Sequence, residues 1–362
     1  MISAKIEYGL NGNINIPGDK SISHRSIIIP SISKGVCEIS NILRSDDVIN
    51  TIEAFKLMGV KIEEIDNKII IHGRGIASLQ KPKKNIYLGN SGTSARLLAG
   101  LLASQNFDST LTGDKSLSSR PMGRIADPLN LMNAKIETKD GKMPIKIYGQ
   151  ELKNSKITIN LPSAQIKSGL ILAALNTKGK TTLIEKHISR NHTELMLKYF
   201  GANIKIKKNN NETIIEIIGK KEIIPKNIDV PSDLSSSAFF IVAALINKNS
   251  NLTLNNININ PTRNGILIAL KKMGANIKFT NIRILNNEKV ADINVKYSQL
   301  KGCILEKDIA KLMIDEYPII SVAAAFAKSP SVFKGLKELR VKESDRLNLI
   351  KMNLEQEIII CK

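Results

Sequence analysis

Five segments of the chain share one pattern of hydrophobic and polar positions. In each, a short apolar strand leads into a polar turn rich in Gly, Ser or Pro, and a helix of small apolar residues follows. The segments recur about every 70 residues, which is longer than a solenoid repeat and suits a small α/β unit. They are 14–33, 86–103, 159–175, 228–246 and 314–327. The pattern therefore predicts a fold built from repeated units.

A second helix is expected in each unit. An arginine opens it, and apolar residues fall at three- and four-residue spacing, as at Leu195, Met196 and Tyr199,. A tail such as Gly-Ala-x-Ile indicates the end of the helix and the start of a strand. These stretches are 44–62, 120–136, 190–204, 263–277 and 340–358. With the alternating strands between them, each unit is predicted to be β-α-β-α-β-β, and the fold class to be α/β.

The first helix of each unit is apolar on almost all sides. Residues 94–103 and 235–245 are examples, and we expect both helices to be buried,. Their N-terminal turns should then converge where free backbone N–H groups favour anions. Equivalent polar turns from different units can therefore face one shared cleft.

Composition narrows the class of protein. The 362 residues, 42% hydrophobic and 24% charged, are typical of a globular chain of about two domains,. Every apolar run is too short to span a membrane, and the N-terminus lacks the layout of an export signal. Cys37, Cys303 and Cys361 are scattered, which argues against disulfides and zinc,. We expect a reduced, soluble, cytoplasmic protein with no membrane partner.

The formal charge of +20 does not by itself indicate nucleic-acid binding. Lysine is spread through the chain, and no basic run is interleaved with aromatic residues for base stacking. We therefore expect no nucleic-acid partner, and we interpret the charge as a bias of the whole composition more than as a dedicated patch.

Two polar turns carry chemistry suited to anions. In PGDKSISHR, Lys20 and Arg25 lie close to the hydroxyls of Ser21 and Ser23, a mixture that suits phosphate or carboxylate ligands,. In LGNSGTSAR, Gly92 would let a ligand approach the backbone. Taken singly, the first turn could equally be a helix cap with solvated charges, and the second is better explained by a glycine that merely makes the turn.

The remaining candidates lie in equivalent turns of other units. Each has an alternative as a helix cap or as part of a solvated helix face. One anion-binding site with an acid/base pair explains the set better than several independent caps do. The candidates are Arg120, Ser163, Gln165, Ser189, Arg190, Asp315 and the segment 342–346.

Together these motifs resemble one family, the 5-enolpyruvylshikimate-3-phosphate synthases, from about residue 5 to about residue 350. The strings K-S-x-S-x-R, G-N-S-G-T and R-V-K-E-S-D-R in one chain carry the resemblance. It implies a two-domain inside-out α/β barrel with three repeat units in each domain. The implied N-terminal domain is 17–230, and the implied C-terminal domain is 1–16 plus 231–362. The implied hinges lie near 16–19 and 228–233.

The resemblance also implies an activity. Family members move the enolpyruvyl group of phosphoenolpyruvate onto the 5-hydroxyl of shikimate 3-phosphate and release phosphate, by addition and then elimination. It implies a monomer that acts on these two small molecules, with no metal and no organic cofactor. It further implies that closure of the cleft strengthens each contact by excluding water.

The residue roles implied by the resemblance fall into three groups. The catalytic residues would be Asp315, which takes the proton from the 5-hydroxyl, and Glu343, which protonates the methylene carbon with Lys20. Those implied to hold shikimate 3-phosphate are Lys20, Ser21, Arg25, Ser163, Ala164 (through its backbone), Gln165, Ser189, Arg190, Asp315 and Lys342. Those implied to hold phosphoenolpyruvate are Lys20, Gly92, Arg120, Gln165 and Arg346.

The sequence also departs from the family pattern. The family normally continues for about one more repeat unit, with an Asp-His-Arg turn and a further Lys, both implicated in binding phosphoenolpyruvate. We therefore expect a C-terminally truncated chain with its last unit missing, and exposed apolar surface in the C-terminal domain.

Three further expectations follow from the resemblance. One alternative is an inactive remnant that binds shikimate 3-phosphate only. Another is the sister enzyme that acts on UDP-N-acetylglucosamine, although that enzyme has Lys-Asn where this chain has Lys20-Ser21, and a reactive loop cysteine that Cys37 does not match. Gly92 is the small residue that goes with glyphosate sensitivity in the family.

Overall fold

The computed structural model describes residues 8–209 and 212–356. The chain divides into two compact units. One is continuous in sequence, Gly18–Val230, and we call it the continuous unit. The other consists of Met1–Pro17 and Pro231–Lys362, and we call it the split unit. Each has its own hydrophobic core.

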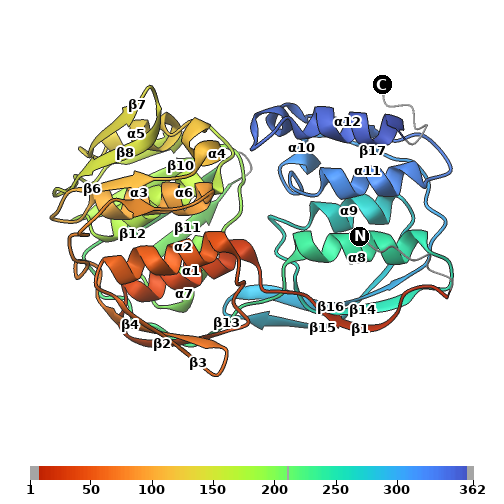
Figure 1. Ribbon diagram of the computed structural model, residues 1–362, viewed down its shortest axis with the longest axis horizontal. Coiled ribbons are helices and arrows are strands. Elements are labelled where there is room, and N and C mark those ends of the chain that lie inside the picture. Colours follow the sequence, from red (N-terminus) through yellow and green to blue (C-terminus); the bar gives the residue numbers. More distant parts are fainter. Residues whose placement is uncertain (1–7, 210–211, 357–362) are drawn as a thin grey trace. The chain divides into compact units, whose positions relative to one another are not determined.

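The continuous unit holds three four-stranded sheets, each with its helices (Figure 1). Their strand orders are β13-β2-β4-β3, β5-β6-β8-β7 and β11-β12-β10-β9. In each sheet one short edge strand (β13, β5 or β9) runs parallel to its neighbour, and the remaining pairs are antiparallel. This is the topology expected of β-α-β-α-β-β units.

The elements of the continuous unit, in chain order, are α1 (Lys20–Ser31), β2 (Lys34–Ser40), α2 (Asp46–Leu57), β3 (Lys61–Ile65), β4 (Lys68–Arg74), β5 (Ile86–Tyr87), α3 (Gly92–Ala103), β6 (Ser109–Thr112), α4 (Lys115–Ser119), α5 (Gly123–Asn130), β7 (Lys135–Lys139), β8 (Lys142–Tyr148), β9 (Lys156–Ile159), α6 (Ala164–Leu175), β10 (Lys180–Glu185), α7 (His192–Tyr199), β11 (Ile204–Lys208), β12 (Thr213–Ile218) and β13 (Ile228–Asp229).

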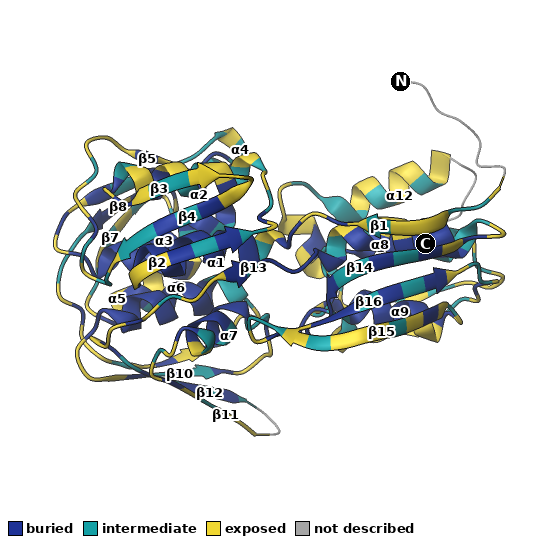
Figure 2. Ribbon diagram, turned by 90° about the horizontal axis from the view of Figure 1, so that it is seen from below, coloured by how far each residue is buried: buried dark blue, intermediate teal, exposed yellow. Residues whose placement is uncertain are grey.

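Two helices form the centre of the continuous unit. α3 and α6 pack side by side, and both are almost entirely buried, as predicted (Figure 2). A Cβ atom on Gly100 of α3 would lie 1.9 Å from the carbonyl oxygen of Gly169 on α6. Because only glycine allows this approach, the two helices pack backbone to backbone.

The split unit is built around one four-stranded sheet with the order β1-β14-β16-β15, and it has a two-stranded parallel sheet, β17-β18. Its elements are β1 (Asn11–Asn15), α8 (Leu234–Ile246), β14 (Asn251–Asn258), α9 (Gly265–Lys272), β15 (Asn276–Leu285), β16 (Glu288–Lys296), β17 (Ile304–Leu305), α10 (Lys307–Ala310), α11 (Tyr317–Ala325), β18 (Val332–Phe333), a 3₁₀ helix (Lys337–Val341) and α12 (Arg346–Gln356).

The prediction of a buried helix is wrong for part of α8. Phe239 and Phe240 are 57% and 46% exposed, although the helix is apolar on nearly all sides. α8 packs against α11, β14 and β16, and the two phenylalanines lie on the surface that these elements leave uncovered. Phe326 after α11 is 58% exposed as well. The exposed apolar surface expected in this part of the chain is therefore present.

Two short strands pair differently from what the repeat pattern suggests. The pattern groups residues 14–33 as one strand, turn and helix. In the structure β1 pairs in parallel with β14 of the split unit, whereas α1 belongs to the continuous unit. In the same way, β13 pairs with β2 of the continuous unit, whereas α8 belongs to the split unit. The strand and helix of these two segments therefore contribute to different cores.

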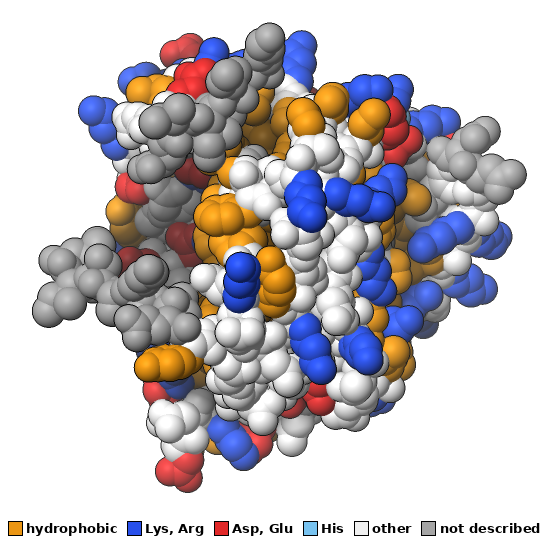
Figure 3. Space-filling view, turned by 90° about the vertical axis from the view of Figure 1, so that its right-hand side faces the viewer, with side chains coloured by type: hydrophobic (Ala, Val, Ile, Leu, Met, Phe, Trp, Pro, Cys, Tyr) orange, Lys and Arg blue, Asp and Glu red, His pale blue; other side chains and the backbone are white. Residues whose placement is uncertain are grey.

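Two surface properties bear on the predictions. None of the helices in the described ranges, 8–209 and 212–356, is long and apolar enough to cross a membrane. On the face drawn in Figure 3, Lys and Arg side chains are interspersed with hydrophobic and other side chains.

Candidate active site

Helices α1, α3 and α6 of the continuous unit each begin at a side-chain cap. Asp19 Oδ1 accepts a hydrogen bond of 2.9 Å from the amide of Ile22 at α1, and Ser91 Oγ accepts one of 3.1 Å at α3. Ser163 Oγ caps α6 and accepts from the amide of Ile166 at 3.4 Å. The prediction that Ser163 caps a helix is therefore confirmed. Ala164 is the first residue of that helix, α6. The candidates Lys20, Ser21, Gly92, Ala164 and Gln165 lie in these first turns, where backbone amides favour anions,.

Arg25 connects the first turn of α1 to two other helices. It is 2% exposed, and its Nε donates to Thr193 Oγ1 at 2.7 Å. Nη2 donates to Ser168 Oγ at 2.8 Å, and Nη1 donates to the carbonyl of Ser21 at 2.8 Å. The planar guanidinium fixes the start of α1 against α6 and α7, because each nitrogen has an acceptor in a defined direction.

The first turns of α3 and α6 are joined by a second arginine. Arg96 Nη1 donates to Gln165 Oε1 at 2.8 Å, and Gln165 Nε2 donates to Thr93 Oγ1 at 3.0 Å. A Cβ atom on Gly92 would lie 2.8 Å from Arg96 Nη1 and 3.2 Å from Arg120 Nη1. The structure therefore brings Gly92, Gln165 and Arg120 together around Arg96.

This group carries concentrated positive charge. Burial, together with the charges of Arg120 and Arg124, lowers the pKa of Arg96 to about 10. Arg120 is held by hydrogen bonds to Asn90 Oδ1 and to Ser116 Oγ. Because crowded like charges raise the local potential, a bound carboxylate or phosphate would be stabilised here.

The start of α1 is also cationic. Lys20 pairs with Asp47 at the start of α2 and is about half exposed. His24 is fully buried, and its Nδ1 lies 2.9 Å from Thr51 Oγ1. Burial, with smaller contributions from Lys20 and Arg25, lowers the pKa of His24 to about 3. His24 is therefore a neutral imidazole at neutral pH.

Ser189 and Arg190 lie in the loop between β10 and α7. The Ser189 amide donates to Glu185 Oε1 at 3.0 Å, and Lys167 Nζ donates to the Ser189 carbonyl at 3.3 Å. Ser189 is buried and Arg190 is half-buried. The loop is thus tied to α6 on one side of the candidate residues.

The split unit brings together a second group of candidate residues. Arg346 Nη1 lies 3.2 Å from Asp315 Oδ1. Its Nε and Nη2 lie 2.7 Å and 3.0 Å from the two oxygens of Glu343. Lys342 is exposed and directly precedes Glu343. Two carboxylates and one guanidinium therefore form a compact acid/base group.

A buried network supports the position of Asp315. The adjacent Glu316 accepts a hydrogen bond from Ser235 Oγ. Arg263, 3% exposed, donates to Ser235 Oγ at 2.7 Å and to Asp233 Oδ1 at 2.9 Å. The expectation that this group and the group in the continuous unit line one cleft remains a prediction.

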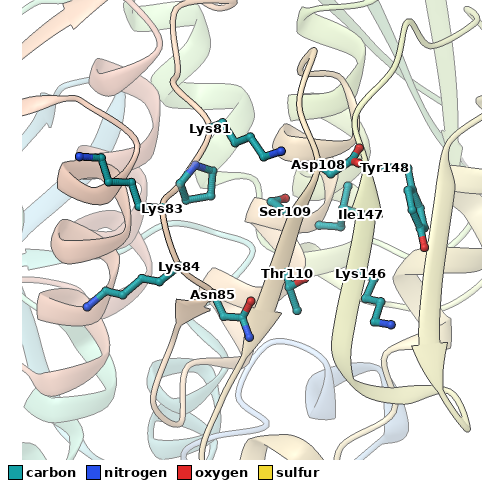
Figure 4. Close-up of a pocket in the computed structure, with 11 residues that line it drawn as sticks. Lys81, Lys83, Lys84, Asn85, Asp108, Ser109, Thr110, Lys146, Ile147 and Tyr148 are labelled. Carbon is teal, nitrogen blue, oxygen red and sulfur yellow. The ribbon is translucent and has the colours of Figure 1, made fainter.

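A cavity of about 260 Å³ lies elsewhere in the continuous unit (Figure 4). It is lined by Lys81, Ser109, Lys146 and neighbouring residues, and none of the predicted site residues contributes to it. Figure 4 shows the side chains of Lys83 and Lys84 pointing away from Ser109. The lysines do not converge on one point, so this cavity is not the candidate site.

Metal binding has no support in the part of the chain that the structure describes. No group of three or more His, Cys, Asp or Glu side chains there is arranged to hold a metal ion.

Sequence analysis missed several residues that shape the site. Arg96 and Thr93 lie in the same motif as Gly92, but their spacing does not reveal their contacts with Gln165. Lys167 carried a clearer signal, because it is a charged residue within the otherwise apolar helix 166–175. A buried charge requires partners, which are Glu185 and Glu194 in the structure,.

Comparison with known proteins places these residues in a wider context. The family model described as EPSP synthase (3-phosphoshikimate 1-carboxyvinyltransferase) matches residues 5–356. The 3-phosphoshikimate 1-carboxyvinyltransferase of Thermoanaerobacter sp. (strain X514) is 46% identical over 356 residues, which cover 98% of this chain and 83% of the relative. That of Vesicomyosocius okutanii subsp. Calyptogena okutanii (strain HA) is 48% identical over 340 residues, which cover 94% of this chain and 77% of the relative. A solved structure of EPSP synthase from Acinetobacter baumannii has a TM-score of 0.86 and 44% identity, covering 96% of this chain and 78% of that one.

Proposed function

This chain belongs to the EPSP synthase family, and we propose that it transfers the enolpyruvyl group of phosphoenolpyruvate to the 5-hydroxyl of shikimate 3-phosphate. The products are 5-enolpyruvylshikimate 3-phosphate and phosphate, in the shikimate pathway to chorismate. The match of the family over residues 5–356 carries the proposal, because that range includes every candidate residue.

Shikimate 3-phosphate binds mainly to the continuous unit. Its phosphate and ring are held by the first turns of α1 and α6 and by the loop before α7, and Asp315 and Lys342 of the split unit complete the set. The hydroxyls, amides and cations of these turns support this assignment, because a phosphate accepts several charge-assisted hydrogen bonds at once. The residues in the continuous unit are Lys20, Ser21, Arg25, Ser163, Ala164, Gln165, Ser189 and Arg190.

Phosphoenolpyruvate binds beside the group of arginines formed by Arg96, Arg120 and Arg124. Arg120 and Gln165 hold it beside Gly92, with Lys20 and with Arg346 of the split unit. The lowered pKa of Arg96 supports this placement, because its causes include the charges of nearby arginines that a dianionic ligand would offset,.

The transfer needs one base and one acid. Asp315 takes the proton from the 5-hydroxyl while that oxygen forms a bond to C2 of phosphoenolpyruvate, and Glu343 with Lys20 delivers a proton to C3. In the second step the group that protonated C3 takes a proton back from it, the C2–C3 double bond re-forms, the C2–O bond to phosphate breaks, and phosphate leaves. General acid/base groups of this kind contribute about 10²–10⁴-fold each.

The setting of the enzyme is part of the same proposal. We place it in the cytoplasm as a monomer, with its two substrates as partners and without nucleic acid. The scattered lysines support the last point, because the charge is not concentrated in a run with aromatic residues,.

Two measurements on the full 362-residue chain test the activity. Calorimetric titration gives the affinity for shikimate 3-phosphate, and release of inorganic phosphate from phosphoenolpyruvate gives the turnover. We expect binding, and phosphate release that depends on shikimate 3-phosphate. UDP-N-acetylglucosamine serves as the control acceptor and should support no release.

The other outcomes separate the alternatives. Binding without phosphate release would mean that the chain holds shikimate 3-phosphate but does not turn over. Release that depends on UDP-N-acetylglucosamine, or no binding of shikimate 3-phosphate at all, would overturn the proposal.

A further inference from the structure

We propose that Lys167 and Glu185 position Ser189 and Arg190 for shikimate 3-phosphate, within a buried charge cluster that Glu194 completes as an ion partner of Lys167. The inference rests on the proposed function and assigns Lys167 and Glu185 as positioning residues of the same site. None of them was among the candidates from sequence.

The cluster consists of one cation between two carboxylates. Lys167 Nζ lies 3.0 Å from Glu185 Oε1 and 2.8 Å from Glu194 Oε1. The three side chains are 1%, 3% and 2% exposed. They come from α6, from the end of β10 and from α7, so the cluster joins the elements on both sides of the 186–191 loop.

The cluster holds Ser189 at three atoms. Glu185 Oε1 accepts hydrogen bonds from both the amide and the hydroxyl of Ser189. Lys167 Nζ donates to the carbonyl oxygen of the same residue at 3.3 Å. Ser189 therefore has little freedom to move relative to α6, and Arg190, the next residue, is carried with it.

The same two helices also hold Arg25. Ser168 follows Lys167 on α6, and Thr193 precedes Glu194 on α7; both accept hydrogen bonds from the Arg25 guanidinium. A shift of α7 relative to α6 would move Ser189 and the Arg25 contacts together. The cluster thus fixes the distance between Arg25 and the Ser189–Arg190 segment, which are both proposed to hold the phosphate.

A purely structural role would not need charge. Burying three ionic groups costs more than filling the same volume with apolar side chains, so such a cluster adds little stability by itself. Burial opposes ionisation of Lys167, but the charges of Glu194 and Glu185 raise its pKa, and it stays protonated. This cluster also forms hydrogen bonds with the backbone amide and carbonyl of Ser189. We therefore attribute its charges to holding the 186–191 loop in position.

Matched variants of the full chain separate positioning from stability. Lys167→Met removes the cation and its bond to Ser189, and Glu185→Ala removes the acceptor of the Ser189 amide. We expect each to weaken binding of shikimate 3-phosphate by about tenfold or more, the value of roughly one lost charge-assisted contact. The KM for phosphoenolpyruvate should change by less than about twofold, because none of its proposed ligands lies in the 186–191 loop.

Two conservative variants serve as controls. Glu185→Gln keeps an oxygen that accepts from Ser189, and affinity should stay within about threefold of the original. Glu194→Gln removes one charge from the same lysine, but the Ser189 contacts run through Glu185 and Lys167. Its affinity should stay within about twofold even where its melting temperature changes.

A double-mutant cycle completes the test. Adding Ser189→Ala to Lys167→Met should weaken binding less than the sum of the two separate effects, because both act on one loop. Where Lys167→Met does not fold, the comparison of Glu185→Ala with Glu185→Gln decides. Equal affinities in that pair, or an equal loss in Glu194→Gln, would overturn the inference while leaving the proposed function intact. Absence of binding by the unchanged protein would overturn both.

Discussion

Arg346 bridges Asp315 and Glu343, the two carboxylates proposed for proton transfer. Its Nη1 is 3.2 Å from Asp315 Oδ1, and its Nε is 2.7 Å from Glu343 Oε1. One guanidinium thus offsets two negative charges before any substrate binds. A phosphoenolpyruvate that takes up Arg346 would weaken these bonds and make the carboxylates better bases.

Arg346→Lys is expected to reduce kcat/KM for phosphoenolpyruvate by about 10²-fold, because an ammonium cannot serve two carboxylates and a substrate in fixed directions. Steady-state phosphate release measures the effect. The matched control is Arg340→Lys, since Arg340 pairs with the exposed Asp345 at 2.9 Å in the same segment. Its rate should stay within about twofold, and a rate for Arg346→Lys equal to that of this control would contradict the assignment.

Asp315→Asn should lower kcat by about 10²–10⁴-fold while the affinity for shikimate 3-phosphate changes by less than about tenfold. The amide keeps the size of the side chain but cannot take the proton of the 5-hydroxyl. Single-turnover phosphate release together with calorimetry separates the two quantities. Full turnover in Asp315→Asn would rule out this residue as the base.

Lys20→Met should weaken the binding of both substrates and reduce turnover to the limit of detection. Lys20 pairs with Asp47, and the uncompensated carboxylate left by the substitution would repel both anions,. Lys34 near the other end of α1 is a suitable control, because it forms an exposed pair with Glu222 at 2.9 Å. Lys34→Met should behave as the original protein does, and the same behaviour in Lys20→Met would refute the prediction.

Gly92→Ala should raise the KM for phosphoenolpyruvate by about tenfold and leave the affinity for shikimate 3-phosphate within about twofold. The new Cβ would lie 2.8 Å from Arg96 Nη1, so that guanidinium must move, and Arg120 next to it. Gly123→Ala is the control, because its Cβ would meet Asp127 only at 3.7 Å. Similar kinetics in both variants would show that the arginines adapt without loss. We also expect Gly92→Ala to be less sensitive to glyphosate than the original protein, which an inhibition assay with added glyphosate would measure.

The stability of the protein should decline as the pH falls from 6.5. His24 has a pKa of about 3 in the folded state and about 6.5 when unfolded, so between these values the unfolded chain binds a proton that the folded chain does not,. The contribution of His24 to the free energy of unfolding is complete above pH 6.5. Below that pH it falls by up to about 1.4 kcal/mol per pH unit. Urea unfolding at pH 7.5 and pH 5 measures this loss. His24→Gln should show a smaller loss over the same interval, and an identical loss would exclude His24 as its source.

Much of the fold could be predicted from local pattern. Helices α3 and α6 and the strands around them follow from apolar periodicity and from the turn residues that separate them. The exposure of Phe239 could not, because periodicity shows that a helix is apolar but not what covers it. The repeat pattern did not show that β1 and β13 separate from the helices that follow them, since a strand of two to five residues does not encode its partner; only the family resemblance implied crossings near 16–19 and 228–233.

The site was predictable to the extent that motifs mark it. Polar turns before apolar helices identified Lys20, Gly92 and Gln165, because those turns had to lie at helix N-termini. Contacts such as Arg96 with Gln165, or Lys167 with Glu194, arise only when separate helices pack together. Which residues make these contacts is decided by the tertiary structure, and a single sequence does not show it.

The pairing of β1 with β14 has a consequence for biosynthesis. Asn11 and Asn251 are partners in this parallel ladder, so β1 cannot pair until some 240 further residues have been made,. Residues 18–230 can fold during that interval, because β13 closes their own sheet. The edge of β1 remains open to wrong partners until β14 has been made, so the pairing of β1 depends on translation speed and on chaperone protection,.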